Sequence, residues 1–267
     1  MLPDARFVNR SGAFWGSVRF VSERLGYSTR SKKASQLRDY SLAEVGGALA
    51  QFAVSKELLD GVCEYLNHRA SFLNETIQPL LMDRSKAEKA YRALVRGYKP
   101  QCHLPQNKQK GKKRHLNYLT CIVNVLTEKN AKVEVDDDPR GMCIVTDQSN
   151  AVVGVLSRWM DGAYPGTVNP KAVWEIKEYY GTTTFGSRVA DGVYESLLDG
   201  LEIRLIEKDC GKRIHHYLFV DDYYTWWGCG KSYLCRLVDM MHMELVDEVI
   251  FGREVFERWP AIIKTWR

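Results

Sequence analysis

The sequence lacks several features that would restrict its location or its chemistry. Its first residues, MLPDARFVNR, contain no apolar run of the kind that a signal peptide needs. No stretch approaches the roughly 18 apolar residues of a membrane-spanning helix. The seven cysteines are odd in number and include no CxxC pair, which is typical of free thiols in a reducing compartment. We therefore expect a cytoplasmic protein without a membrane span.

Acidic residues are missing from one long segment, although the whole chain is nearly balanced in charge. The 267 residues are 45% hydrophobic and 27% charged, with a formal net charge of +5, which is ordinary for a folded soluble protein. No Asp or Glu occurs between Glu88 and Glu128, where lysine and arginine are frequent. Such a segment attracts a polyanion. We expect DNA phosphates to contact its densest part, and the alternative is a solubilising loop; the residues concerned are Lys108, Lys110, Lys112, Lys113 and Arg114.

Helical periodicity dominates the first hundred residues. Ser41 and Glu44 have the spacing of a capping box, and apolar residues follow at helical spacing. Residues 99–113 break the pattern, with two prolines and five lysines, and indicate a loop between two regions. We expect a helical region over residues 1–114, which helps to hold DNA or forms a subunit interface, and a second region over residues 115–267.

The second region has the alternating pattern of an α/β protein. Short β-branched runs predict strands at residues 142–145, 151–156, 172–180 and 217–220. Helical patterns lie at residues 115–129, 187–198 and 232–243. The order helix, three strands, helix, strand, helix predicts a central mixed sheet flanked by helices.

One segment of this region places three charged residues together. Turn-forming residues cluster between residues 165 and 170, so we expect the chain to reverse near Val168. In an antiparallel pair centred there, Asp161 lies opposite Glu175, with Cβ atoms about 5 Å apart. Lys177 projects on the same side as Glu175, because residues two apart on a strand share a face. The sequence therefore predicts two carboxylates and one lysine on one face of the sheet.

This set of groups suits phosphodiester hydrolysis. Two close carboxylates repel, and a divalent cation relieves the repulsion. Mg²⁺ prefers oxygen ligands and completes its shell with water and substrate phosphate. The ion polarises a phosphoryl oxygen and lowers the pKa of a bound water, while a lysine offsets the negative charge of the transition state. The alternative is an exposed hairpin on which Glu175 and Lys177 form a surface ion pair.

The pattern of Asp161, a hairpin, and then Glu175-Ile176-Lys177 in an apolar strand resembles the PD-(D/E)XK nuclease superfamily, which includes many restriction endonucleases. The resemblance covers roughly residues 115–225, and the residue before the aspartate is Met160 instead of proline. It implies that Asp161 and Glu175 bind Mg²⁺, that the backbone carbonyl of Ile176 is a further ligand, and that Lys177 positions the attacking water. A carboxylate on the preceding helix joins the site in some members, and Glu128 is the candidate here.

Two other segments are candidates for DNA contact. Residues 179–188 are small and hydroxylated, which would let Thr183, Ser187 and Arg188 approach phosphates; the alternative is a plain connection between strand and helix. Gly230-Lys231-Ser232 looks like the end of a phosphate loop, but the first glycine of that motif would fall on Thr225. We therefore expect no nucleotide cofactor, and Lys231 is a further DNA candidate.

These observations together predict a Mg²⁺-dependent endonuclease with Asp161, Glu175 and Lys177 as catalytic residues. A type II restriction endonuclease that cuts double-stranded DNA at a specific sequence is the preferred interpretation, and such an enzyme is expected to be a homodimer. A repair or phage-defence nuclease would carry the same triad. The alternative from another class is a non-catalytic nucleic-acid-binding protein, in which the basic segment would be the functional part.

Overall fold

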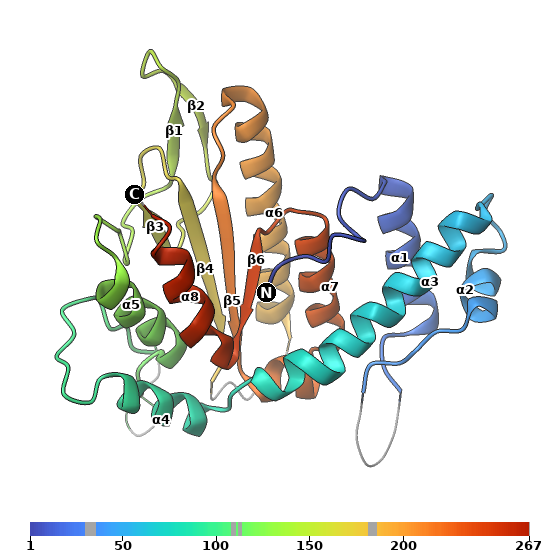
Figure 1. Ribbon diagram of the computed structural model, residues 1–267, viewed down its shortest axis with the longest axis horizontal. Coiled ribbons are helices and arrows are strands. Elements are labelled where there is room, and N and C mark those ends of the chain that lie inside the picture. Colours follow the sequence, from blue (N-terminus) through green and yellow to red (C-terminus); the bar gives the residue numbers. More distant parts are fainter. Residues whose placement is uncertain (30–35, 108–110, 112–113, 181–185, 267) are drawn as a thin grey trace.

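The computed structural model describes residues 1–29, 36–107, 111, 114–180 and 186–266. A group of N-terminal helices lies to one side of a sheet that carries helices on both faces (Figure 1). In the described ranges no helix has both the length and the apolar character that crossing a membrane would require. All seven cysteines are free thiols.

The N-terminal group contains three helices, and each begins at a serine. The side chains of Ser11, Ser41 and Ser55 accept hydrogen bonds from backbone N–H groups of the first turn, which satisfies donors that the helix itself leaves unpaired. The capping box predicted at Ser41 and Glu44 is confirmed. The helices are α1 (Gly12–Leu25), α2 (Leu42–Leu49) and α3 (Lys56–Ser71). They enclose an apolar cluster of their own, centred on Phe7, Phe14, Val45, Tyr65 and Leu66.

The chain leaves α3 through a π-helical turn (Phe72–Ile77) and a 3-10 turn (Gln78–Leu80), where Pro79 lacks an amide donor. It then forms α4 (Arg84–Leu94), which packs against α5 (Tyr118–Asn130). Residues on both sides of the predicted boundary at residues 114 and 115 thus share one apolar cluster. The position of that boundary stays a prediction.

A four-stranded mixed sheet forms the centre of the second region, as predicted. The strand order is β3-β4-β5-β6; β3 pairs antiparallel with β4, and the other two pairs are parallel. The strands are β3 (Gly162–Tyr164), β4 (Ala172–Glu178), β5 (His215–Asp221) and β6 (Glu248–Phe251). One face is covered by α5 and α8 (Val255–Ile263). The other is covered by α6 (Ser187–Cys210) and α7 (Lys231–His242) (Figure 1).

The strands predicted at residues 142–145 and 151–156 form, but they are not part of this sheet. They are β1 (Ile144–Thr146) and β2 (Val152–Val155), which pair with each other in a separate ribbon that projects from the body (Figure 1). The strand beside β4 is instead the short β3, which follows Asp161 and is the antiparallel partner expected from the reversal near Val168. Periodicity missed β6 and α8, and it predicted only the first half of α6; α1 lies within the region predicted to be helical.

Candidate active site

Asp161 and Glu175 lie opposite each other across the β3–β4 hairpin. The described pair Gly162–Trp174 has residue numbers that sum to 336, as do those of Asp161 and Glu175, so the predicted register is confirmed. The Asp161 amide donates to the Trp174 carbonyl at 3.0 Å. The Asp161 Oδ2 atom accepts a hydrogen bond from the Ile176 amide at 2.7 Å, so this carboxylate is held directly against β4.

The turn of this hairpin is fixed by Asn169. Its backbone φ is +53°, a left-handed conformation that asparagine tolerates better than most residues. Its side-chain oxygen accepts a hydrogen bond from the Thr146 amide at 2.9 Å, and its amide nitrogen donates to the Thr146 hydroxyl at 2.9 Å. The turn is thus tied to the β1–β2 ribbon.

Glu175 and Lys177 point toward α6 and are almost completely buried, with exposed fractions of 2% and 6%. The Lys177 Nζ atom lies 2.8 Å from Glu175 Oε2 and 2.8 Å from Glu195 Oε2. Glu195 is carried by α6. Glu175 and Lys177 are therefore brought together as predicted, with a further carboxylate, Glu195, for which the sequence pattern favoured an exposed helix face.

Arg158 is a second residue that sequence reasoning missed. Its guanidinium lies 3.0 Å from Glu175 Oε1, 2.8 Å from Asp199 Oδ2 and 3.3 Å from Glu195 Oε2. It follows β2 in a bend that shows no motif. Glu195 and Asp199 are four residues apart on α6 and so share one face of the helix. In the sequence, this four-residue spacing was the one indication that Glu195 and Asp199 belong to the site. The same spacing is common on exposed helix faces, so it does not distinguish a site from a solvated surface.

A glycine on α6 allows the helix to approach the site. A Cβ atom at Gly192 would lie 2.7 Å from the Tyr179 hydroxyl and 3.4 Å from Lys177 Cδ. The absence of a side chain there lets Lys177 pass the helix and reach Glu195 one turn further along. A larger residue at position 192 would displace Tyr179 or the lysine.

The charged groups of the site shift one another's proton affinity. Surrounding protein atoms raise the pKa of Asp161 to about 7, and the Glu175 charge adds to this effect, although one side of the Asp161 residue is open to solvent. Burial likewise raises the pKa of Asp199 to about 7, against the opposing charge of Arg158. Burial alone would lower the pKa of Lys177, but its carboxylate partners raise it. The lysine is therefore a permanent cation, and the two aspartates hold protons more readily than usual.

The remaining predicted metal ligands are placed as follows. Ile176 is half-buried and pairs with Phe219 of β5. Glu128 lies in the last turn of α5, where its carboxylate accepts hydrogen bonds from the amides of Gln101 and Cys102 at 3.0 to 3.1 Å. Within the described ranges, no group of three or more His, Cys, Asp or Glu residues has the arrangement of a complete metal site.

The predicted DNA-contacting residues are only partly visible. Lys108, Lys110, Lys112, Lys113 and Thr183 lie outside the described residues. Arg114, Ser187 and Arg188 are exposed, as a phosphate contact requires.

The structure corrects the prediction for Lys231. This residue is 7% exposed, its ammonium group donates to the Trp227 carbonyl, and it lies 4.8 Å from the centre of the Trp227 ring. The π-helical turn Tyr223–Cys229, rich in aromatic residues and called here the aromatic turn, precedes α7. A lysine that is buried against this aromatic turn reaches no phosphate.

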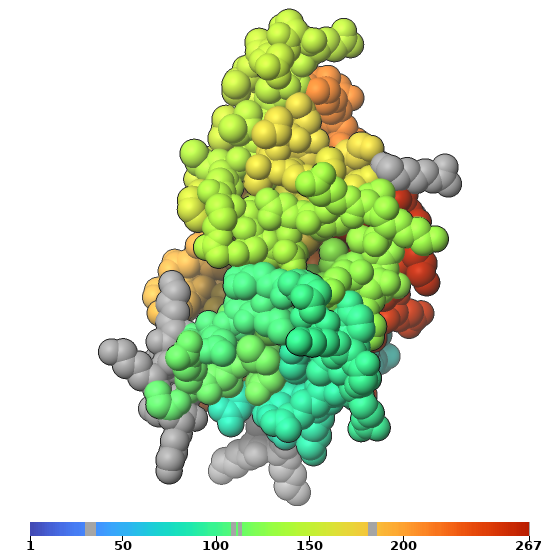
Figure 2. Space-filling model, turned by 90° about the vertical axis from the view of Figure 1, so that its left-hand side faces the viewer, coloured from blue at the N-terminus to red at the C-terminus, as the bar shows by residue number. Residues whose placement is uncertain are grey.

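A pocket of about 240 Å³ opens beside Asp161 and gives access to it. It is polar, and its lining includes His103, Asn117, Thr120, Asp137, Asp138, Arg140 and Trp159. Figure 2 shows a face built largely of the green to yellow-green segments, to which these lining residues belong. Asp161 lines this pocket, but Glu175 and Lys177 do not.

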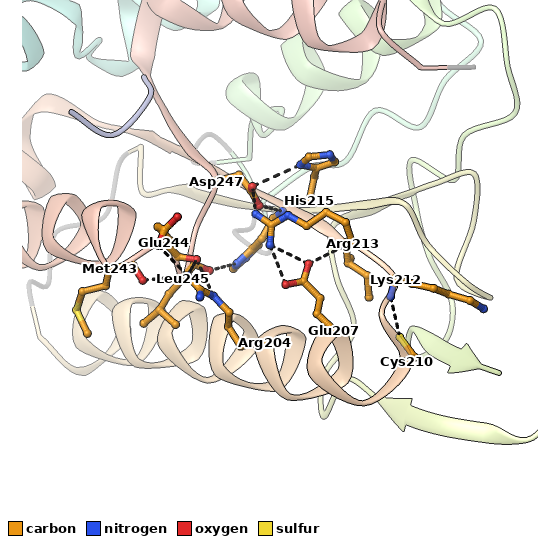
Figure 3. Close-up of polar contacts among 12 residues, drawn as sticks. Arg204, Glu207, Cys210, Lys212, Arg213, His215, Met243, Glu244, Leu245 and Asp247 are labelled. Carbon is orange, nitrogen blue, oxygen red and sulfur yellow. Dashed lines mark hydrogen bonds and ion pairs between the residues drawn. The ribbon is translucent and has the colours of Figure 1, made fainter. Parts of the chain in front are cut away.

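A larger cavity, of about 640 Å³, lies near the start of β5 and does not include the triad. Arg213 and His215 line it and both lie next to Asp247, at distances of less than 3.5 Å; Arg213 also pairs with Glu207 of α6 at 2.8 Å (Figure 3). These ion pairs join α6 to β5 and the segment before β6. We therefore assign them to the stability of the fold and not to the candidate site.

Comparison with known families divides the chain close to the end of the 3-10 turn before α4. Residues 1–76 match the family described as domain of unknown function DUF7690. No curated protein matches the sequence, and no solved structure matches it. The second family match extends over residues 82–266, which is more than half of the chain and contains the whole candidate site. The chain therefore belongs to the family described as domain of unknown function DUF7687.

Proposed function

We propose that this protein is a magnesium-dependent DNA endonuclease that hydrolyses phosphodiester bonds. The observation that supports this most directly is the juxtaposition of Asp161, Glu175 and Lys177 on adjacent strands of a mixed sheet. The same three residues carry the resemblance to PD-(D/E)XK nucleases. A surface ion pair, the alternative interpretation of Glu175 and Lys177, does not account for a pair that is almost fully buried.

The balance of charge in the site supports a divalent cation. Three carboxyl groups (Glu175, Glu195 and Asp199) form ion pairs with two cationic side chains (Arg158 and Lys177), and the Asp161 carboxyl group lies opposite Glu175 across the hairpin. If all are ionised, the cluster carries two excess negative charges. The Asp199 Oδ1 atom is buried and accepts no hydrogen bond among the described residues, and Glu175 Oε1 has only the ion pair with Arg158 there. A doubly charged ion that prefers oxygen ligands offsets this excess, so the residues present fit Mg²⁺.

Asp161 and Glu175 would hold the ion. When bound, Mg²⁺ supplies Lewis-acid polarisation of the scissile phosphate and a bound water of lowered pKa. Lys177 remains charged because Glu175 and Glu195 stabilise its ammonium form. Its Nζ atom therefore presents a fixed positive charge to the negative charge that develops on phosphate oxygens during attack. Glu195 and Arg158 position Lys177 and Glu175 and are not themselves expected to contact the substrate.

Double-stranded DNA is the proposed substrate, and a type II restriction endonuclease is the preferred form of the activity. The acid-free segment between Glu88 and Glu128 supports a polyanionic substrate. The exposed Arg114 and Arg188 have the charge and accessibility that phosphate contact needs. A repair or phage-defence nuclease with the same triad is equally compatible with these residues.

Plasmid cleavage by the full chain with Mg²⁺ or with EDTA tests the proposal. We expect discrete fragments with Mg²⁺ and intact plasmid with EDTA. Discrete fragments would support sequence-specific cutting, and a smear would favour a nuclease without sequence specificity. DNA that is bound equally well in both buffers but never cut would establish a nucleic-acid-binding protein instead.

Arg158→Met tests the charge balance of the site separately from cleavage. The change leaves Glu175 and Asp199 without their guanidinium partner, so we expect the unfolding free energy in EDTA to fall by about 2 kcal/mol. The excess negative charge rises, so Mg²⁺ should raise the melting temperature more in the variant than in the wild type. Thermal unfolding with and without Mg²⁺ measures both effects. Arg92→Met, at an exposed arginine that pairs with Glu88 within α4, is the control and should behave like the wild type.

A further inference from the structure

The outer face of α6 carries a stripe of exposed apolar side chains. Tyr194, Leu198, Leu201 and Leu205 have exposed fractions of 46%, 44%, 47% and 62%. They are spaced four, three and four residues apart, which is the repeat of helices that pack side by side. Four large apolar side chains over three turns amount to a patch of a few hundred Å², a size that marks an interaction site on a soluble protein.

The opposite face of α6 is fixed to the body of the protein, so the stripe cannot turn inward. A Cβ atom at Gly200 would lie 2.4 Å from the carbonyl oxygen of Leu245, which shows how closely the helix approaches the segment before β6. Arg204 donates hydrogen bonds to the carbonyls of Met243 and Glu244 in the same segment (Figure 3). The stripe is therefore a permanent feature of the surface.

A charged residue lies at each end of the stripe, one turn beyond the apolar residues. Asp191 precedes Tyr194 by three residues, and Lys208 follows Leu205 by three; both are exposed. Neither forms an ion pair within the part of the chain that the structure describes. The stripe thus has an acidic end and a basic end.

The order of these six residues is self-complementary when the helix direction is reversed. In the pairs Asp191–Lys208, Tyr194–Leu205 and Leu198–Leu201, the two residue numbers always sum to 399. We propose that α6 pairs antiparallel with α6 of a second copy of this chain, about a two-fold axis between Leu198 and Leu201. Each apolar residue then meets an apolar residue, and each charge meets the opposite charge, in an interface that uses one patch twice.

Apolar surface also lies beyond each end of the stripe, and the two surfaces would face each other in an antiparallel pair. Near the C-terminal end, β2 packs on Ile206 through Gly154 and exposes Val152 and Val155. Near the N-terminal end, Tyr194 borders a largely apolar pocket of about 280 Å³. Antiparallel pairing brings β2 of one copy toward the pocket of the other, which adds area toward the roughly 800 Å² per partner of a stable interface. This inference does not depend on the proposed nuclease activity.

Sedimentation equilibrium of the full chain tests the pairing. We expect the wild type to have twice the chain mass of 30.7 kDa, and the double variant Leu198→Glu, Leu201→Glu to dimerise at least about a hundredfold more weakly. Both leucines are exposed, so circular dichroism should show an unchanged fold. Leu42→Glu, at a leucine of α2 with 45% exposure, is the control and should remain dimeric. A wild type that is monomeric at about 100 µM, or a double variant that dimerises normally, would overturn the proposal.

Charge reversal tests the direction of the pairing. Asp191→Lys and Lys208→Asp each place two like-charge pairs in an antiparallel dimer, and we expect each to weaken association by about tenfold. The two changes combined restore opposite charges and should restore the wild-type dissociation constant. In a parallel dimer each residue would face the same residue of the other copy. Like charges would then be opposed in the wild type and in every variant, so neither single change should weaken association. Two single effects without restoration would refute the antiparallel arrangement.

Discussion

Glu175→Gln and Lys177→Met are each expected to slow magnesium-dependent plasmid cleavage by at least about a hundredfold. The glutamine keeps the shape of Glu175 but removes the negative charge that would hold the ion. The methionine fills the space of Lys177 but removes the positive charge that faces the developing phosphate charge. Initial cleavage rates at saturating Mg²⁺, with plasmid as substrate, measure both losses.

The matched control for these variants is Glu88→Gln. Glu88 forms an exposed ion pair with Arg92 within α4, so its replacement removes the same charge away from the site and should leave the rate unchanged. Gel-shift binding in EDTA should be close to that of the wild type for all three variants, because most of the proposed phosphate contacts lie outside the triad. Wild-type cleavage by folded Glu175→Gln protein would exclude the triad as the catalytic centre.

Gly162→Ala is expected to lower the unfolding free energy by about 3 kcal/mol. A Cβ atom at position 162 would lie 2.0 Å from two ring atoms of Trp174. That ring cannot move aside freely, because it is fully buried and lies 5.2 Å from the Trp259 ring and 5.9 Å from the Trp266 ring, centroid to centroid. The conflict must therefore displace β3 from β4, and with it Asp161. Urea unfolding measures the loss of stability.

Gly166→Ala provides the control within the same hairpin. No atom lies within 4 Å of a Cβ built at Gly166, so we expect a change in stability of less than about 0.5 kcal/mol. We also expect Gly162→Ala to lose cleavage activity under conditions where it is still folded, since the Asp161–Glu175 register is disturbed. Equal stability of the two alanine variants would mean that β3 and β4 are not packed as described.

The local features of this chain were predictable because each depends on residues that are close in sequence. The turn formers between residues 165 and 170 determine where the hairpin reverses, and this alone places Asp161 opposite Glu175. Ser41 and Glu44 form their capping box within one helical turn. The mixed sheet between helices followed from the order of periodic segments, although strands as short as β3 and β6 contain too few residues to show a period.

The surroundings of the triad were not predictable, because they come from elements far apart in the chain. Arg158 reaches Glu175 only because the bend after β2 lies beside β4. Lys231 follows two glycines and looks accessible in sequence, yet the packing of α7 against the aromatic turn buries it. No local pattern distinguishes such residues from solvated charges.

The sequence by itself determined the two strands, the turn between them and the alternation that puts Glu175 and Lys177 on one face. These depend on backbone geometry with a period of two residues and on turn chemistry, both of which are local. Only the tertiary structure decided that α6 covers this face, with Gly192 allowing close approach and with Glu195 and Asp199 directed inward. The same packing leaves Tyr194, Leu198, Leu201 and Leu205 exposed. A helix of mixed character can bury either side, and the choice is made by the surface against which it packs.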